Sequence, residues 1–558
     1  MLRLLVPLPL LFAGAALSAQ TVDSPGAASA QALSEIRARN AIVNEPLPPD
    51  QAAMKAHVMF LASDAMRGRE AGSAEYDIAA QYVAAQFYAA GLKPAGDDGS
   101  YLQHVPLIGY KPKGEGAFSL EMDGATIPLT YGADYLPSGN AAKDVTQASG
   151  RLVFVGQGIV APQYRQDDYA GVDVRGKIVA LVRGAPDRFD GEERAHYGST
   201  ATKLIEAAKH GAVGAVMLMA PGSSLERMKE YVSHESVTWA DADGNGHVAA
   251  PQTPMLGTIG GNAATRLMLA GKVDPQAMHD SIAKGTFRAI AFPATLNARV
   301  ETERRRIESA NVSGLIEGGD PKLKDQIVVL SAHLDHVGVG KADAAGDTIY
   351  NGAMDNAVGV ASLIEEAKRF RSAGKAPRRS ILFLAVTAEE KGLVGSDYFA
   401  HHPTVPKQNL VADVNLDMPI ITFPFEDVIA FGAARSSLGP IVKQAAADAG
   451  VSFSPDPMPE MGLFVRSDHY RFVQQGIPSV FLWPGEKGPG KAATEEFFAN
   501  HYHKPSDQID RNGVDWKQGV RFVDVNYQIA REIADADQRP AWNKGDFFGT
   551  LYNGYGAR

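Results

Sequence analysis

A histidine-rich stretch, SAHLDHVGVG at residues 331 to 340, follows the apolar run IVVL. It places His333, Asp335 and His336 where a buried strand is expected to end. Further acidic and imidazole side chains stand where later apolar runs stop, or in loops that precede helices. These are Asp355, Glu389, Glu390, Asp417 and His503. Because active sites in parallel α/β sheets lie at the carboxyl ends of the strands, we expect these side chains to converge.

This set combines histidines with several carboxylates, and the chain contains no cysteine. Such nitrogen and oxygen ligands suit zinc, and also manganese or cobalt. One zinc ion needs only three protein ligands, so the surplus predicts two ions about 3.5–4 Å apart that share a carboxylate. The neighbours Glu389 and Glu390 leave a strand in different directions, so one can bind metal while the other acts as general base. His336 and His501 are interpreted as non-ligands, because each lies close to a better candidate.

The elements that must position these residues alternate between apolar runs and helical patterns. QIVVLSAH (326–333) and SILFLAVTAEE (380–390) are typical of buried strands, and NAVGVASLIEEAKRF (356–370) of a helix. This alternation predicts an α/β fold, with a mostly parallel mixed sheet flanked by helices. Short apolar runs between 151 and 220, separated by turns, predict a smaller β-rich module with one or two helices.

A chain of 558 residues is too long for one ordinary core, so we expect a domain split by an insert. The expected boundaries are 1–19 for a signal peptide, 20–50 for a flexible arm, 51–144 and 286–540 for the split domain, 145–285 for the insert, and 541–558 for a C-terminal tail.

The first nineteen residues carry Arg3, an apolar run and small residues up to Ala19, which is typical of a secretory signal cleaved before Gln20. We therefore expect an exported bacterial protein, periplasmic or secreted. The absence of cysteine excludes disulfides and a lipidated cysteine. No other run is long and apolar enough to predict a membrane span in the mature protein. The net charge of -10, without a basic stripe, argues against a nucleic-acid partner.

Six motifs in this order resemble the co-catalytic zinc aminopeptidases, the family of bacterial leucyl aminopeptidase and aminopeptidase Y, related to glutamate carboxypeptidase II. The motifs are SDAMRGREAGS (63–73), SAHLDHVG, NGAMDNAVG, TAEEKGLVGS, NLDM and YHKPSD. The resemblance covers most of residues 50–140 and 290–535. The insert resembles the protease-associated domain found in many members.

The resemblance implies a zinc exopeptidase fold, peptide substrates and two Zn2+ ions, for which Co2+ or Mn2+ can substitute. It makes Asp355 the bridging ligand, with His333 and Asp417 completing one site. Glu390 and His503 complete the other. Glu389 becomes the general base that takes a proton from a metal-bridging water, and Asp335 the acid that orients His333. His469, in RSDHYRF (466–472), resembles part of a loop near the substrate.

Other functions fit the sequence less well. GQGIVA (156–161) matches a dinucleotide-binding pattern, but PQYRQDDYAGV follows it without an apolar-periodic helix. Ser467, Asp468 and His469 are contiguous and cannot line up as a serine triad, and the chain has no G-x-S-x-G elbow. The complete two-metal ligand set disfavours a single-zinc glutaminyl cyclase. It also disfavours a receptor-like binding protein without metal, of which the transferrin receptor is an example among relatives of this fold.

The substrate stays open at this stage. Aminopeptidase activity is favoured by its frequency in the family, and carboxypeptidase or aminoacylase activity is the alternative. Arginines that recognise a substrate carboxylate could be Arg466 or Arg471, which the sequence cannot place in a pocket. Side-chain preference, oligomeric state and the task of the insert are also left open.

Overall fold

A computed structural model describes residues 25–558. The predicted signal peptide, 1–19, lies outside the described residues. The chain divides into two compact units, one up to Leu47 and one from Pro48 onward. The first contains α1 (Pro25–Val43), so most of the described part of the expected flexible arm is helical, and residues 44–48 are not. The alanines and arginines of this segment, which are strong helix formers, account for the difference.

The second unit is built on a long mixed sheet whose centre is parallel. Its strands, in spatial order, are β11 (Ser236–Trp239), β2 (Leu102–Pro112), β13 (Ile290–Ile316), β17 (Ser380–Val386), β14 (Ile327–His333), β18 (Leu410–Asn415), β21 (Ser479–Pro484), β19 (Asp427–Phe431) and β20 (Ser452–Ser454). The short β1 (Lys93–Pro94) pairs with the end of β13. Every residue of β14, β17 and β18 is buried, as expected for parallel strands covered on both faces. The predicted α/β fold class is confirmed.

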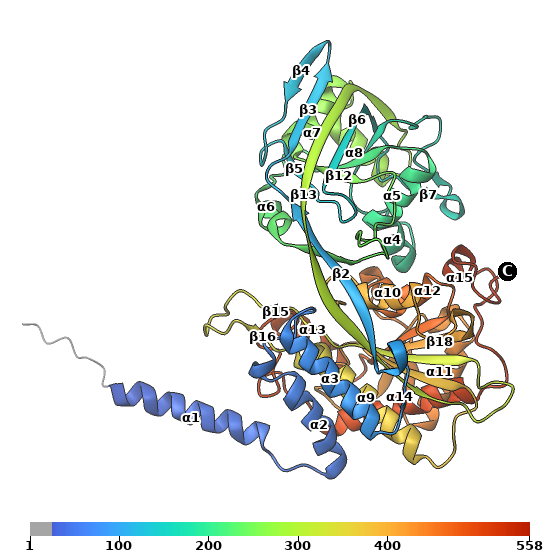
Figure 1. The fold of residues 1–558 in the computed structure, drawn as a ribbon. Helices are drawn as coiled ribbons and strands as arrows, with labels where there is room; N and C mark the ends of the chain where they lie inside the picture. Colours follow the sequence, from blue (N-terminus) through green and yellow to red (C-terminus); the bar gives the residue numbers. More distant parts are fainter. Residues whose placement is uncertain (1–24) are drawn as a thin grey trace, which may run out of the picture. The chain divides into compact units, whose positions relative to one another are not determined.

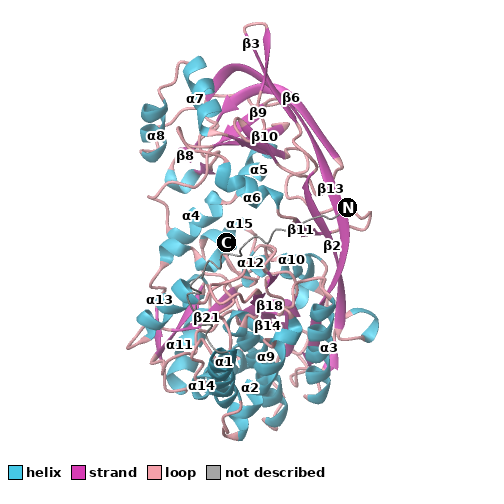
Figure 2. Ribbon diagram, turned by 90° about the vertical axis from the view of Figure 1, so that its left-hand side faces the viewer, coloured by secondary structure: helices cyan, strands magenta, loops and turns pink. Residues whose placement is uncertain are grey.

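Helices cover both faces of this sheet (Figures 1 and 2). One face carries α2 (Pro49–Leu61), α3 (Ala74–Ala89), α9 (Val358–Ser372), α11 (Leu438–Asp448) and α14 (Trp516–Asp535). The other carries α10 (Val394–His401) and α12 (His469–Val473). Two further helices are α13 (Gly490–Asn500) and, near the C-terminus, α15 (Phe547–Leu551).

We call residues 117–301 the insert and the rest of the second unit the body. A second sheet forms the core of the insert. Its strands, in spatial order, are β4 (Ala125–Pro128), β3 (Ala117–Met122), the first half of β13, β6 (Val145–Phe154), β9 (Ile178–Leu181), β10 (Gly214–Leu218), β12 (Met255–Ile259) and β5 (Tyr135–Pro137). Its helices are α4 (Gly191–Gly198), α5 (Thr200–Lys209), α6 (Glu226–Ser233), α7 (Gly261–Ala270) and α8 (Pro275–Ala283). The expected boundaries 145–285 stay a prediction, although strands before residue 145 also pair in this sheet.

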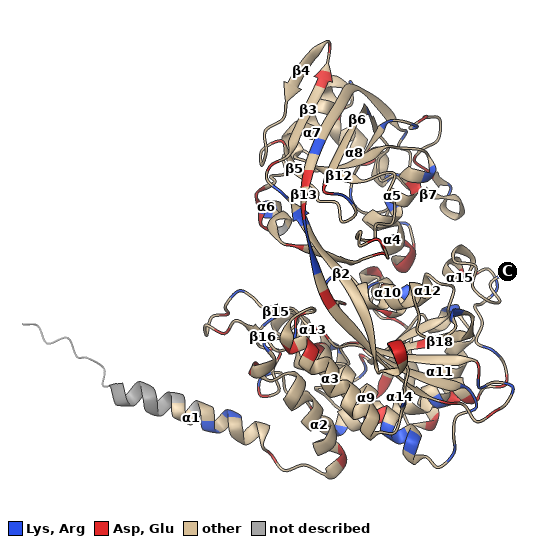
Figure 3. Ribbon diagram, in the orientation of Figure 1, with Lys and Arg blue, Asp and Glu red and all other residues tan. Residues whose placement is uncertain are grey.

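The strand β13 joins the two sheets. Over 27 residues it pairs with β6 and β3 in the insert, then with β2 and β17 in the body. Figure 3 shows charged residues along the stretch of β13 between the two sheets. Arg305 there binds Glu235 of the insert through both oxygens of the carboxylate. The strand β2 pairs with the second half of β13, and β11 of the insert pairs with β2, so a strand of the insert also joins the sheet of the body.

The strand ends of the body meet at one edge of its sheet. His333 is the last residue of β14, Glu389 and Glu390 follow β17, and Asp417 follows β18. This is the edge at which α/β sheets bind ligands. Two small antiparallel pairs, β15 (Gly338–Val339) with β16 (Ile349–Tyr350) and β7 (Val160–Ala161) with β8 (Gln166–Asp167), complete the strands. Among the described residues, none of the helices is both long and apolar enough to cross a membrane.

Candidate metal centre

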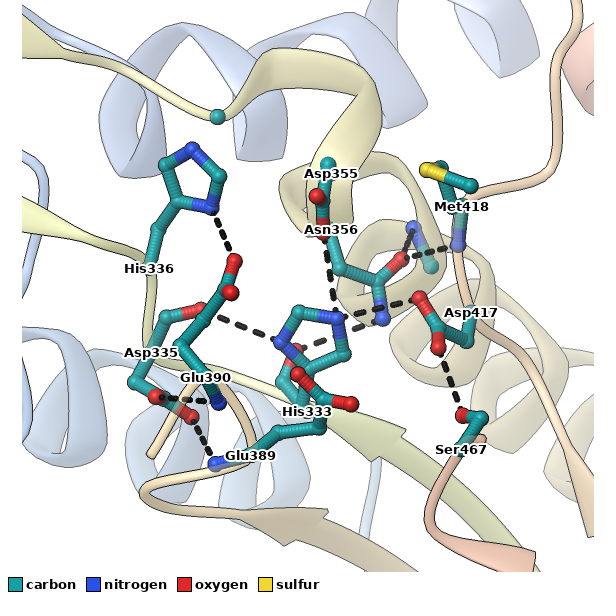
Figure 4. Close-up of polar contacts among 12 residues, drawn as sticks. His333, Asp335, His336, Asp355, Asn356, Glu389, Glu390, Asp417, Met418 and Ser467 are labelled. Atoms are coloured by element: carbon teal, nitrogen blue, oxygen red, sulfur yellow. Dashed lines mark hydrogen bonds and ion pairs between the residues drawn. The ribbon is translucent and has the colours of Figure 1, made fainter. Parts of the chain in front are cut away.

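Asp355 lies between two groups of ligand-type side chains (Figure 4). Its Oδ1 is 3.2 Å from His333 Nε2, which is also 3.0 Å from Asp417 Oδ1. Its Oδ2 is 3.3 Å from His503 Nε2, which is also 3.0 Å from Glu390 Oε2. The five residues that the sequence predicts as metal ligands therefore come together, and Asp355 offers one oxygen to each side.

The ring of His333 is oriented by a backbone oxygen. Its Nδ1 lies 3.1 Å from the carbonyl oxygen of Asp335, which can only accept, so Nδ1 carries the proton and donates. The lone pair of Nε2 then faces the carboxylates of Asp355 and Asp417, an arrangement that needs a proton or a metal ion between them. Burial alone would lower the pKa of His333, but the charges of Asp417 and Glu389 raise it well above its usual range.

The carboxylate of Asp335 does not orient His333, in contrast to the role that the resemblance implies. It accepts hydrogen bonds from the backbone N–H groups of Glu389, at 3.0 Å, and Glu390, at 3.3 Å. The turn after β14 directs the side chain of Asp335 away from the imidazole and toward the segment after β17. Burial raises the pKa of this carboxyl group to about 6. Asp335 thus fixes the two glutamates, and its own backbone oxygen fixes the histidine.

His336 lies in the second group, although the sequence analysis interprets it as a non-ligand. Its ring is completely buried, and Nδ1 is 2.7 Å from Glu390 Oε1. Neither atom of this close pair satisfies hydrogen-bond geometry, and His336 Nε2 has no partner among the described residues. His336, Asp355 and Glu390 form a group that could hold a metal ion, and so do His333, Asp355 and Asp417. The turn after β14 brings His336 back to Glu390, and the interpretation of His336 as a non-ligand stays a prediction.

The described residues of both groups fit divalent cations. Each group joins imidazole nitrogen to carboxylate oxygen, the donor set that zinc prefers in the absence of cysteine. Buried atoms without partners, such as Glu390 Oε1, are expected where an ion completes the contacts. Hydrogen bonds to Asp355 and Glu390 raise the pKa of His503 to about 10 against the effect of burial. The site thus favours positive charge at this nitrogen as well.

Three positioning residues around Asp355 were missed in the sequence analysis. The buried guanidinium of Arg69 donates to the carbonyl oxygens of Leu334, at 2.7 Å, and Gly352, at 2.8 Å. The carboxylate of Asp507 accepts from the backbone N–H groups of Met354 and Asp355. Asn356, joined to Asp355 by a cis peptide bond, donates to Leu416 O and accepts from Met418 N. Arg69, Asn356 and Asp507 lie within the quoted motifs SDAMRGREAGS, NGAMDNAVG and YHKPSD, and this membership is the signal that could have identified them.

Gly352 shows how closely these loops approach. Its φ is +59°, and a Cβ atom there would meet Asp355 O at 2.2 Å and the ring of His336 at 2.6 Å. Only glycine accommodates both the left-handed backbone and this contact. The loop that carries Asp355 can therefore lie directly against His336.

Asp417 is held by two groups that do not belong to either ligand set. Ser467 donates from Oγ to Asp417 Oδ2 at 2.5 Å, and Trp483 donates from Nε1 to the backbone oxygen at 2.8 Å. Asp417 Oδ1 is left to face His333. Met418, the next residue, has a left-handed backbone with φ of 50°, as do Ala388 before Glu389 and His503 itself. Such conformations cost about 1–3 kcal/mol each and persist where surrounding contacts enforce them, often at functional sites.

A small cavity opens beside the first group. Its lining residues combine the site with apolar and aromatic side chains: His333, Asp355, Glu389, Asp417, Met418, Leu463, Arg466, Ser467, Phe481, Trp483, Phe498, Tyr502 and His503. Glu389 faces this cavity, and burial together with the charges of nearby carboxylates raises its pKa well above the usual range. The cavity therefore places a candidate base next to a wall that includes apolar and aromatic side chains.

His469 does not line this cavity, in contrast to the predicted substrate contact. Its ring is completely buried between Phe464 and Phe481, with centroids 5.2 and 5.3 Å away. Burial lowers its pKa to about 3. The first turn of α12 points the side chain behind the cavity wall, so this arrangement does not favour a direct contact with substrate.

A larger cavity of about 600 Å3 lies on the other side of Glu390. It is lined by Glu70, Ala71, Gly72, Ser73, His234, Glu235, Ser236, Val237, Arg305, Ile307, Glu390 and Lys391. Lys391 Nζ is 2.6 Å from Glu70 Oε1. Both the body and the insert contribute walls, so this cavity lies at the junction of the two modules.

Sequence comparison identifies the part of the chain that carries the site. The profile of Peptidase family M28 matches residues 311–530. The curated relatives include a probable glutamate carboxypeptidase VP8 from Zea mays, 27% identical over 74% of this chain and 58% of that protein. A probable leucine aminopeptidase 2 from Aspergillus oryzae is 27% identical over 36% and 38%. Aminopeptidase YwaD from Bacillus subtilis is 28% identical over 39% and 43%.

The alignments thus span between 38% and 58% of these relatives' own lengths. Among solved structures, an aminopeptidase from Aneurinibacillus sp. strain AM-1 aligns with a TM-score of 0.48 at 20% identity, over 87% of this chain and 93% of that one. The zinc aminopeptidase BSAP from Bacillus subtilis aligns with a TM-score of 0.40 at 17% identity, over 88% and 97%. The region that matches the family model, residues 311–530, contains all five predicted ligands and Glu389. Residues 311–530 of this chain therefore match the model of peptidase family M28.

Proposed function

We propose that the protein is a zinc-dependent exopeptidase, an aminopeptidase that removes N-terminal residues from peptides. The observation that carries this proposal is the position of Asp355, whose two oxygens face His333 on one side and His503 on the other. A shared carboxylate between two nitrogen and oxygen ligand sets is the arrangement of two-metal hydrolytic sites. Peptide substrates agree with the family of residues 311–530.

The residues that would hold the ions are His333 and Asp417 on one side, Glu390 and His503 on the other, and Asp355 between them. His336 is an additional candidate on the second side. When bound, two zinc ions supply Lewis acidity, which polarises a carbonyl group and lowers the pKa of a water molecule. The orientation of His333 is consistent with this, because its Nδ1 donates to the carbonyl oxygen of Asp335 and its Nε2 is the atom that faces Asp355 and Asp417.

Glu389 is the group proposed to move the proton. It takes a proton from the attacking water and returns it to the nitrogen of the leaving amine. Glu389 lines the small cavity beside His333 and Asp417, where the substrate is proposed to bind. Asp335, which receives the N–H groups of Glu389 and Glu390, keeps the base and the neighbouring ligand in place.

The small cavity is proposed to receive the side chain of the N-terminal residue. Met418, Leu463, Phe481 and Trp483 offer an apolar surface next to Glu389 and Asp417. Burial of a larger apolar side chain there stabilises the complex. We therefore expect leucine or phenylalanine at the N-terminus to be favoured over charged residues.

The test is mass spectrometry of one short peptide after incubation with the zinc-loaded protein. The peptide is used in three forms: free, N-acetylated and C-amidated. An aminopeptidase trims the free and amidated forms from the amino end and leaves the acetylated form intact. Three intact peptides would contradict an exopeptidase and favour a binding protein of the same fold.

Carboxypeptidase activity is the second candidate. Arg466 lines the small cavity and is exposed, and its guanidinium makes no hydrogen bond with the described residues, so it could bind a substrate carboxylate. Arg471, by contrast, is engaged by Gln474 and the carbonyl oxygen of Gly392. Removal of the last residue of the free peptide, abolished by amidation, would establish this alternative. An aminoacylase would instead release the acetyl group.

Two further features of the protein are proposed with this function. The signal predicted at 1–19 would direct export to the periplasm or the medium. The insert is proposed to be a protease-associated domain, a suggestion supported by its sheet, which is covered by apolar clusters on both faces. N-terminal sequencing of the protein from a culture medium or periplasmic extract tests the first; a start at Gln20 is expected.

A further inference from the structure

The helix α4 of the insert lies against a loop that helps to form the small cavity. We call this loop, residues 459–467, the cavity loop; Leu463, Arg466 and Ser467 line the cavity. Arg194 on α4 donates from Nη2 to the backbone oxygen of Glu460 at 3.1 Å. At Gly462, a Cβ atom would meet Ala195 of the same helix at 2.6 Å. The insert thus contacts the cavity loop directly.

A buried ionic junction fixes this contact. Arg435 of the body donates from Nε to Glu192 Oε2 on α4 at 2.5 Å, and from Nη1 to Asp546 Oδ2 at 3.0 Å. The exposed fractions of these three side chains are 17%, 15% and 8%, so water screens the charges only weakly. Asp546 also caps α15, by accepting from Gly549 N at 2.8 Å. One guanidinium therefore joins the insert, the body and the C-terminal segment.

The junction is joined to the cavity through Phe464. The guanidinium of Arg435 lies 5.5 Å from the ring of Phe464 and 4.8 Å from that of Phe548. The ring of Phe464 is completely buried, and a Cβ atom on Gly432 would meet it at 2.1 Å. Phe464 therefore has little room to move, and its neighbour Leu463 is held at the cavity wall.

A second contact strengthens the same connection. His196, on α4, lies with Nδ1 2.9 Å from the hydroxyl of Tyr470, in the first turn of α12 after the cavity loop. His196 and Tyr470 are both buried, and Phe548 packs edge-on against each of them. The insert thus contacts both the cavity loop and the helix α12 that follows it.

We propose that Arg435, through Glu192 and Asp546, is a positioning residue that sets the shape of the side-chain cavity, so that the insert controls which N-terminal side chains the protein accepts. This inference rests on the proposed aminopeptidase function. It assigns the insert a part in substrate selection through a fixed contact with the cavity wall. Arg435 itself touches neither the ligand groups nor the substrate.

The test compares Glu192→Gln with Glu193→Gln, a matched control on the same helix. Glu193 accepts a hydrogen bond from Gln163 within the insert and forms no ion pair with the body among the described residues. Hydrolysis of alanyl, leucyl and phenylalanyl 4-nitroanilides is measured with the zinc-loaded proteins. In Glu192→Gln we expect KM for the leucyl and phenylalanyl compounds to rise about tenfold, with kcat, zinc content and the alanyl KM little changed. Asp546→Asn should act in the same direction, and the control should match the wild type.

Hydrogen exchange of the same proteins provides a readout that does not depend on activity. Amides of residues 463–467 should exchange about tenfold faster in Glu192→Gln than in the control. Equal KM changes for all three substrates, or unchanged exchange in the cavity loop, would overturn the inference. If the wild type hydrolyses none of the compounds, the proposed function fails, while the exchange experiment still decides whether the junction holds the loop.

Discussion

The two halves of the candidate metal centre share Asp355 but differ in how firmly the chain holds them. In the first half, His333 is fixed by the carbonyl oxygen of Asp335, and Asp417 by Ser467 and Trp483. In the second half, the side chain of His503 is 37% exposed, and Glu390 Oε1 has no hydrogen-bond partner among the described residues. Two histidines lie beside Glu390, one at each of its oxygens.

The difference teaches that one metal position is preorganised and the other depends more on the ion itself. Groups that are already held in place lose little freedom when they bind an ion, which favours affinity. We therefore expect the first position, at His333 and Asp417, to bind more tightly than the second. The surplus histidine in the second half makes that position more tolerant of substitution.

Asp355→Ala is expected to have the largest effect, because it removes a ligand from both halves. Both ions should be lost and hydrolysis should fall to the background rate. Metal content by mass spectrometry checks this, and circular dichroism checks that the variant is folded. Retention of one ion at unchanged affinity would show that Asp355 serves only one half.

Glu389→Gln tests proton transfer without removing a ligand from either half of the metal centre. Loss of the proton acceptor should lower kcat by about 10²–10⁴-fold, since this is the usual contribution of a general base. Metal content should stay at the wild-type value, because Glu389 belongs to neither ligand group. Near-normal rates would assign proton transfer to another residue.

His333→Ala and His503→Ala contrast the two halves directly. His333→Ala should weaken the first ion by more than about 100-fold, the upper cost of disturbing a supporting contact. His503→Ala should have a smaller effect, because His336 lies 2.7 Å from the same glutamate and can replace it. Competition with a chromophoric chelator measures both affinities. If the two variants lose metal affinity equally, His336 does not replace His503 as a ligand. In that case, adding His336→Asn to His503→Ala should leave the affinity for the second ion unchanged.

Ser467→Ala is expected to have the smallest effect and to act on the first half alone. Removal of the hydroxyl frees Asp417 Oδ2, which should weaken the first ion by about tenfold. The second ion should keep its affinity. A matched Ser506→Ala variant, whose hydroxyl donates only to the backbone oxygen of Asn500, serves as control. Equal weakening of both ions would mean that the halves are coupled through more than Asp355.

The sequence was sufficient for the parts of this site that are set by local pattern. Apolar runs predicted the parallel strands, and the rule that sites lie at strand ends brought together His333, Glu390 and Asp417 before any geometry was known. Asp355 and His503 were found through spacing and resemblance. Each of these signals is carried by a short stretch of the chain.

The misses depend on contacts between distant segments. Whether His336 turns toward Glu390, and whether the carboxylate or the backbone of Asp335 faces His333, is decided by the path of the turn after β14. Arg69 donates hydrogen bonds to carbonyl oxygens more than 250 residues away along the chain. The contact of Glu192 with Arg435 spans 243 positions and has no local signal. Periodicity and motif spacing carry no information on such pairings.

The most direct test of two unequal positions that share one carboxylate is a zinc titration of the metal-free protein, followed by native mass spectrometry. The account predicts that one ion binds first and that a second follows at higher zinc concentration, to a total of two per chain. In His503→Ala the second step alone should shift to higher concentration. Saturation at a single ion, or a shift of the first step in this variant, would contradict the account.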